Sequence, residues 1–146
     1  MKICFVVNSV ESEGAGTTVY MMHEAWKRNH DVYLMGVGDF SFTQNEALSI
    51  ISTSLPKSFK PKSPEEHLEM LQGEKATIKK LEAKQLDVLF IRNNPTEEDQ
   101  GRHWAEAAGV AFGRMVQQEG VLLPSLMLLL TSSILKNCLL ISSRHH

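Results

Sequence analysis

A strand, a helix and a second strand within the first ~35 residues constrain the fold of this chain more than any other feature. Residues 2–8 form a continuous apolar run rich in β-branched side chains, which is typical of a strand buried on both faces. From Thr17 the apolar residues recur with helical spacing, and Asn29 can end that helix before a second short strand over residues 31–35. This βαβ unit predicts two parallel strands joined by a right-handed crossover.

The remaining elements extend this unit into an α/β domain. Residues 40–55 predict an antiparallel hairpin with its turn at Gln44-Asn45, and residues 63–85 predict a helix with an interrupted apolar face. Further elements are a buried strand, a helix and the beginning of another strand, at residues 86–92, 97–118 and 120–123 respectively. We therefore expect an α/β fold with a Rossmann-like, mostly parallel sheet flanked by helices and with a β-hairpin insertion.

Composition and charge exclude several classes of protein. The 146 residues are 42% hydrophobic and 22% charged, as in a single globular domain, and the net charge of -2 provides no basic surface for nucleic acid. Two cysteines, Cys4 and Cys138, are too few for a disulfide framework, which favours a reduced cytoplasmic setting. The apolar N-terminal run lacks a small-residue cleavage site after it, so we interpret it as a strand.

The segment after Gly120 differs from the rest of the chain. It contains no acidic residue, and 14 of the 21 residues from Val121 to Ile141 are apolar. That length suits a membrane span, but Pro124 near its start and Lys136 inside it weaken this interpretation, so we expect no membrane association. Exposed leucines in this tail would instead promote self-association, which predicts a homo-oligomer.

Residues 8–18 (NSVESEGAGTT) form the first candidate site. A dinucleotide fingerprint needs a third glycine where this chain has Val19, and a phosphate-binding P-loop needs a Lys before Ser or Thr, which is missing here. Thr17 and Thr18 stand at the start of the predicted helix, where backbone N–H groups favour a carboxylate or a phosphate. A plain surface loop capped by Thr17 remains an alternative.

The second candidate site is Arg92-Asn93-Asn94-Pro95, at the carboxyl end of a predicted buried strand. Open α/β sheets bind ligands at this end of their strands, Arg can hold a carboxylate through two hydrogen bonds, and Asn can donate and accept. Alternatively, Arg92 pairs with an acidic residue of the next helix. The histidines show no metal-binding spacing, and no set of catalytic side chains is recognisable, so neither a metal nor a catalytic residue is predicted.

Taken together, four segments resemble the N-terminal (pre-ATP-grasp) domain of bacterial glutathione synthetases and related ATP-grasp ligases, over about residues 2–123. They are KICFVVNSVESE, TTVYMMHEAWKRNHDVYLMGVGDFSF, LDVLFIRNNP and QEGVLL. Residues 35–39 fit the family pattern M-x-x-G-D, and Arg92 to Pro95 fit R-x-[DN]-P. Asn94 stands where many relatives have Asp.

The resemblance implies ATP-dependent ligation, in which a phosphorylated carboxylate is attacked by an amine. In that family ATP and magnesium bind to the central and C-terminal domains, so no cofactor is expected in this chain, and the isolated chain is expected to be inactive. By analogy, eight residues would face a small amino-acid or peptide substrate: Asn8, Ser9, Thr17, Thr18, Arg92, Asn93, Asn94 and Pro95.

The tail departs from the family pattern, because relatives continue with N-[DK]-P-x-x-L where this chain reads Leu123-Pro124-Ser125-Leu126-Met127. We therefore divide the chain into a family-like domain at residues 1–123 and an atypical apolar tail at residues 124–146, and a frameshift near residue 123 would explain the difference. Alternatively, the tail is native and the chain is a stand-alone α/β ligand-binding or protein-interaction module.

Overall fold

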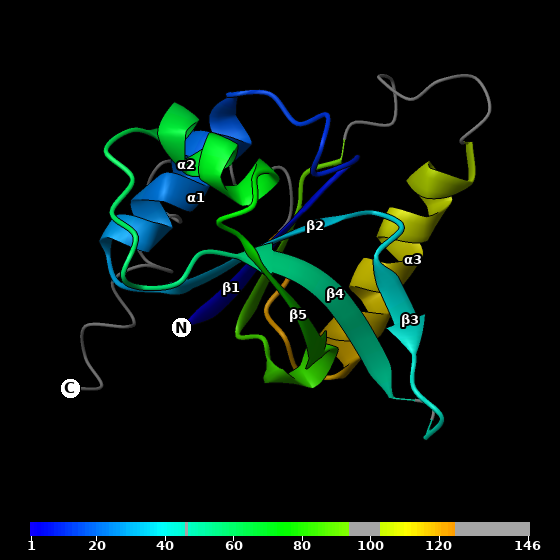
Figure 1. The fold of residues 1–146 in the computed structure, drawn as a ribbon. Coiled ribbons are helices and arrows are strands. Elements are labelled where there is room, and N and C mark those ends of the chain that lie inside the picture. Colours follow the sequence, from blue (N-terminus) through cyan, green and yellow to red (C-terminus); the bar gives the residue numbers. More distant parts are fainter. Residues whose placement is uncertain (46, 94–102, 125–146) are drawn as a thin grey trace.

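The computed structural model describes residues 1–45, 47–93 and 103–124, and it shows a mixed α/β fold (Figure 1). Helices α1 and α2 lie together beside one part of a six-stranded sheet, and α3 lies on its other side. The elements in chain order are β1 (Lys2–Val7), α1 (Thr17–Lys27), β2 (Asp31–Gly36), β3 (Phe40–Phe42), β4 (Leu48–Ser54), α2 (Pro64–Gln72), β5 (Thr77–Glu82), a short 3₁₀ helix (Ala83–Gln85), β6 (Val88–Ile91) and α3 (His103–Gln118).

The predicted βαβ unit is confirmed. Strands β1 and β2 pair in parallel from Lys2↔Asp31 to Val7↔Gly36, and α1 connects them. The helix ends as expected beside Asn29, whose φ of 64° is the left-handed conformation that Asn tolerates better than most residues. Strand β6 then pairs in parallel with the other side of β1.

The expectation of a mostly parallel sheet is not confirmed, because the sheet is mixed. Strand β4 is antiparallel to β2, β3 and β5, and the strand order is β3-β4-β2-β1-β6 with β5 paired to β4. The predicted hairpin is present as β3 and β4, but β4 also joins the main sheet through Leu34↔Thr53. What was expected to be an insertion is therefore a structural part of the sheet.

The predicted helix over residues 63–85 is correct only in its first half. The Ser63 hydroxyl accepts from the Glu66 N–H at 3.1 Å, so the N-cap is confirmed, but α2 ends at Gln72 with Gly73 as its C-cap. The chain then turns back as β5, which forms six residue pairs with β4. Ile78, which fits the helical pattern, is instead 75% exposed on this edge strand. Gly73 ended the helix because glycine favours helix ends over helix interiors.

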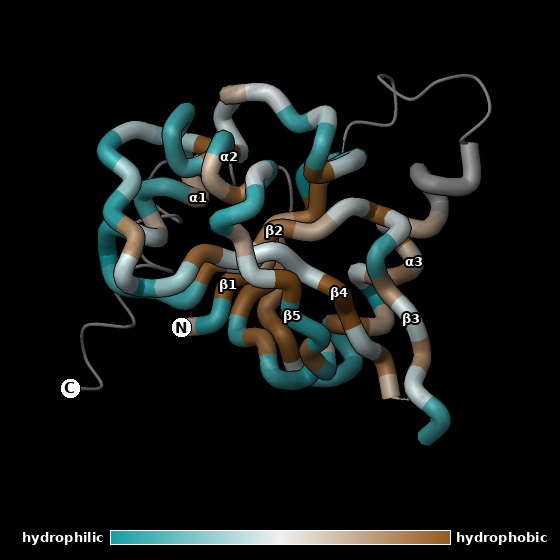
Figure 2. Tube along the Cα trace, viewed as in Figure 1, coloured by the Kyte–Doolittle hydropathy of each residue, from teal (hydrophilic) through white to brown (hydrophobic). Residues whose placement is uncertain are grey.

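Two hydrophobic clusters cover the two faces of the sheet, which explains the continuous apolar runs of β1, β2 and β6 (Figure 2). Alternate residues of each strand point to opposite faces. One cluster joins β1, β2 and β6 to α1 and α2 around Phe5 and Phe90, whose rings stack at 5.0 Å. The other contains Cys4, Met35 and Leu89 and packs against Phe112 and Val116 of α3.

After α3 the chain returns to the sheet edge. Leu122 forms one parallel bridge with Val88, where a further strand was expected to begin. The first residues of the helix predicted over 97–118 and the tail from residue 125 lie outside the described residues. No helix in the part of the chain that the structure describes is both long and apolar enough to cross a membrane.

Candidate functional site

The parallel register of β1, β2 and β6 brings three connecting segments to one edge of the sheet. Val7 is opposite Gly36, and Val6 is opposite Ile91, so all three strands end together. The backbone continues this alignment one step further, because the Val37 N–H donates to Val7 O at 2.9 Å and the Arg92 N–H donates to Val6 O at 2.7 Å. The two candidate sites predicted from sequence therefore lie at the same edge.

A hydrogen bond joins these two sites directly. The Arg92 Nε donates to the Thr18 Oγ1 at 3.2 Å, although 74 residues separate them in the sequence. Thr18 is buried in the first turn of α1 and Arg92 is partly buried, so the contact holds the guanidinium beside the start of that helix. No carboxylate in the described residues forms an ion pair with Arg92. The acidic residues 97–99 of the predicted next helix lie outside the described residues.

The start of α1 carries no neutralising charge of its own. Gly16 is the N-cap residue and provides no side-chain hydrogen bond, and the first turn contains no acidic residue. The alternative of capping by Thr17 is wrong, because Gly16 is the N-cap and Thr17 is the first helical residue. The partial positive charge at this helix end therefore adds to the charge of Arg92.

The loop between β1 and α1 is tied to α2. The side-chain amide of Gln72 donates to Val10 O at 2.8 Å and to Glu13 O at 3.0 Å. The Ser9 hydroxyl donates to the Glu11 carboxylate at 2.6 Å, which lowers the pKa of Glu11. Ser9, one of the predicted site residues, thus already has a partner within its own loop.

Neither Gly14 nor Gly16 is required in this loop for lack of space for a side chain. A methyl group built at either position would meet no atom within 4 Å, and neither residue has the left-handed backbone that favours glycine. The two glycines therefore leave the loop open on its outer side. This arrangement gives no support to close approach of a phosphate chain.

The segment that follows β2, up to Asp39, is the third segment at this edge of the sheet. The Asp39 carboxylate accepts from the Gly36 N–H at 2.8 Å, and a Cβ at Gly36 would meet this oxygen at 2.9 Å. Asn8 O and Ser9 Cα lie 3.6 Å from the same Cβ position. Gly36 therefore lets the segments after β1 and β2 approach closely. Sequence reasoning marked this glycine and aspartate only through the family pattern.

Asn93 lies against α3. A Cβ at Gly109 would meet its Oδ1 at 3.0 Å and Nδ2 at 3.2 Å, with Val37 Cγ2 at 3.3 Å. Gly109 thus makes room for the Asn93 amide, a role that the sequence could have indicated only by a glycine inside a helix. Two further predicted site residues, Asn94 and Pro95, lie outside the described residues.

The described residues contain no group of three or more His, Cys, Asp or Glu side chains that could hold a metal ion. Cys4 is fully buried in β1, and burial raises the pKa of its thiol, as expected for a core residue. The chemistry available at the sheet edge is therefore binding by a guanidinium, a helix end and amides.

A family model described as the N-terminal domain of prokaryotic glutathione synthetase matches residues 1–104, which is well over half of the chain. The chain belongs to this family. No curated protein matches it. The glutathione synthetase N-terminal domain match includes β1 to β6 and both candidate segments, and it ends in the first turn of α3.

Proposed function

We propose that this chain is the N-terminal, substrate-binding domain of a glutathione synthetase-like, ATP-dependent carboxylate–amine ligase. The observation that carries the proposal is the hydrogen bond between Arg92 and Thr18, which places a guanidinium at the start of α1 inside the region matched by the family. The substrate would be a small amino acid or peptide, and its carboxylate would bind here.

The geometry suits a carboxylate for two reasons. The contact with Thr18 occupies only the Nε–H of Arg92, so the four N–H groups on its two Nη atoms can form paired hydrogen bonds with a carboxylate. The uncompensated start of α1 adds favourable charge on the same side. Asn93 and the loop after Asn8 would contribute polar contacts around the same group.

In this proposal ATP and magnesium bind to the central and C-terminal domains of the full-length ligase, as the family resemblance implies. The loop from Ser9 to Gly16 lacks the features of a phosphate-binding loop, and no metal-binding cluster is present in the part of the chain described. We therefore assign no catalytic step to this chain. We further propose that the chain is cytoplasmic. It would consist of an α/β domain at residues 1–123 and a separate tail at residues 124–146 that promotes homo-oligomers.

Calorimetric titration of the full chain with glutathione, the product in the family name, tests the proposal. We expect binding that Arg92→Met weakens by about tenfold or more, since a hydrogen bond to a charged group contributes about 1.5–3 kcal/mol. Arg28→Met is the matched control, because Arg28 pairs with Glu24 on the surface of α1. Equal affinity in wild type and Arg92→Met would reject the site and favour a stand-alone module that binds elsewhere.

A further inference from the structure

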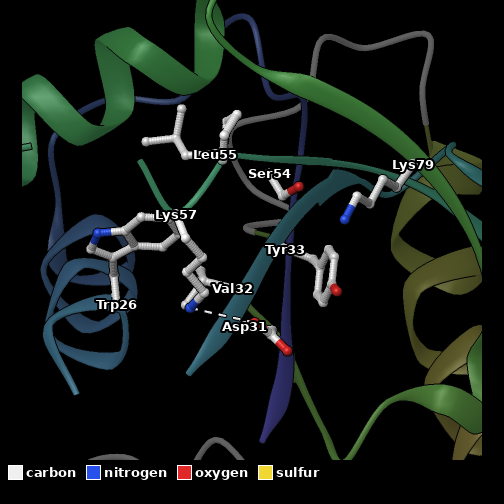
Figure 3. Close-up of a pocket in the computed structure, with 9 residues that line it drawn as sticks. Trp26, Asp31, Val32, Tyr33, Ser54, Leu55, Lys57 and Lys79 are labelled. Atoms are coloured by element: carbon white, nitrogen blue, oxygen red, sulfur yellow. Dashed lines mark ion pairs between the residues drawn. The ribbon is translucent and has the colours of Figure 1, made fainter. Parts of the chain in front are cut away.

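A pocket lies at the opposite end of β2 from the proposed substrate site. Its volume is about 110 Å³, and residues from α1, from the start of β2, from the end of β4 and from β5 line it (Figure 3). Pockets for drug-sized ligands have volumes of about 300–1,000 Å³. This pocket is therefore too small for a nucleotide or a peptide and suits a ligand of a few atoms.

The pocket exists because the sheet splits at this point. Strands β2 and β4 share a single residue pair, Leu34↔Thr53, whereas β1 and β2 share six and β4 and β5 share six. The start of β2 and the end of β4 form no further residue pair in the described part of the chain. As a result, side chains from both faces of the sheet reach the same space, and Trp26 and Tyr33 belong to the core clusters of opposite faces.

Two lysines bring positive charge to this space. The Lys57 ammonium donates to His30 O at 2.8 Å, lies 3.4 Å from the Asp31 carboxylate and stands 4.8 Å above the Trp26 ring centroid. It is thus held in place and largely neutralised by Asp31. Lys79 forms no ion pair with any described residue, so its charge is in excess.

The hydroxyl groups of Tyr33 and Ser54 line the pocket together with Lys79, which is unpaired among the described residues. Residue alternation and the registers of β4 with β2 and β5 put Lys79, Ser54 and Tyr33 on one face of the sheet. Figure 3 shows the Lys79 side chain extending from β5 toward the Tyr33 ring. Tyr33 and Ser54 are each 6% exposed, and neither hydroxyl has a hydrogen-bond partner among the described residues. Burial raises the pKa of Tyr33, so its hydroxyl keeps its proton.

We propose that this pocket binds a small tetrahedral oxyanion of the phosphate or sulfate class. Lys79, Tyr33 and Ser54 donate to its oxygens, whereas Lys57, paired with Asp31, lies across β2 from them at the far side of the pocket (Figure 3). The bound anion would connect β5 to β2 across the split and stabilise the outer part of the sheet. This inference is independent of the proposed function.

Titration of the full, ¹⁵N-labelled chain with sodium phosphate tests this inference, with ionic strength held constant by chloride. Resonances of the Tyr33, Ser54 and Lys79 amides report on the pocket, and those of Thr18 and Arg92 report separately on the proposed substrate site. We expect the pocket resonances to shift with saturation. Lys79→Gln should weaken the affinity by about tenfold and Tyr33→Phe by a smaller factor.

Lys80→Gln is the matched control, because Lys80 pairs with Ile51 and points to the other face of the same edge strand. It should leave the phosphate affinity of the pocket unchanged. The inference is overturned by pocket resonances that do not saturate, by equal affinities in Lys79→Gln and wild type, or by shifts confined to Thr18 and Arg92. Shifts confined to Thr18 and Arg92 would exclude the oxyanion pocket and would not argue against the proposed substrate site.

Discussion

The Nδ1 atoms of His23 and His67 lie 3.2 Å apart in the contact between α1 and α2. His67 is 1% exposed, and its ring also meets the Trp26 ring edge-on at a centroid distance of 5.2 Å. Two imidazoles this close can share a hydrogen bond only when at least one is neutral. The packing of α1 against α2 therefore depends on the protonation state of this pair.

Acid should destabilise the domain through this pair. Burial, and secondarily the charge of His23, lower the pKa of His67 from 6.5 to about 4. The stabilisation is complete above pH 6.5 and is lost as the pH falls toward 4, because the unfolded chain then binds more protons. The loss reaches at most about 3 kcal/mol.

Urea unfolding at pH 7, 6 and 5 measures this loss. In His67→Leu the free energy of unfolding should depend less steeply on pH across that interval. Acidic residues with lowered pKa values, such as Glu24, are protonated only at lower pH. The pH dependence of stability between pH 7 and 5 therefore comes largely from the histidines. An unchanged slope in His67→Leu would mean that the pair does not control acid stability.

Gln72 should hold the loop between β1 and α1. Replacing it with Leu removes the donors to Val10 O and Glu13 O, and we expect a loss of about 1–2 kcal/mol in stability together with faster amide exchange over residues 10–16. Gln72→Glu should be worse than Leu, because a carboxylate would face two carbonyl oxygens. Exchange rates equal to those of wild type in both variants would show that the loop is held by other contacts.

Gly109 should matter for binding more than for folding. Alanine favours a helix over glycine by about 1 kcal/mol, but a Cβ here would lie 3.0 Å from Asn93 Oδ1, so the amide must shift by a few tenths of an ångström. Gly109→Ala is therefore expected to weaken glutathione binding while leaving the melting temperature near that of wild type. Gly14→Ala, which meets no atom within 4 Å, serves as the control and should bind normally. Normal binding by Gly109→Ala would remove Asn93 from the site.

The stacked pair of Phe5 and Phe90 should carry much of the core stability. Both rings are buried, and Phe90→Ala leaves a cavity that costs about 3–5 kcal/mol. Phe42→Ala is the control, because this ring is 59% exposed and its loss should cost under about 0.5 kcal/mol. Denaturant unfolding measures the loss of stability in both variants. A loss in Phe90→Ala as small as that in Phe42→Ala would contradict the importance of the stacked pair.

The sequence predicted the parallel part of the fold well, because burial on both faces leaves a continuous apolar run and a parallel pair needs a crossover helix. The family resemblance, and not this reasoning, assigned Thr18 and Arg92 to one site, and the structure joins the two side chains by a hydrogen bond. The antiparallel part was less predictable. Ile78 and Leu81 fit a helical spacing as well as a strand, and only pairing with β4, a long-range contact, decides between them.

Details of the candidate site depended on contacts that no local pattern encodes. Gln72 reaches Val10 and Glu13 from a helix about 60 residues away, and Gly109 meets Asn93 only after α3 packs on the sheet. A sequence shows which residue types are present, but it does not show which donors the fold has already used.

The most direct measurement of the central claim follows the Arg92 Nε–H resonance of the full chain during addition of glutathione. This proton is the donor to Thr18, so it reports on the guanidinium that is proposed to hold the substrate carboxylate. We expect a saturable shift of this resonance together with the resonances of the Thr18 and Asn93 amides. A binding isotherm observed elsewhere in the chain, while these three resonances stay in place, would show that glutathione binds at another site.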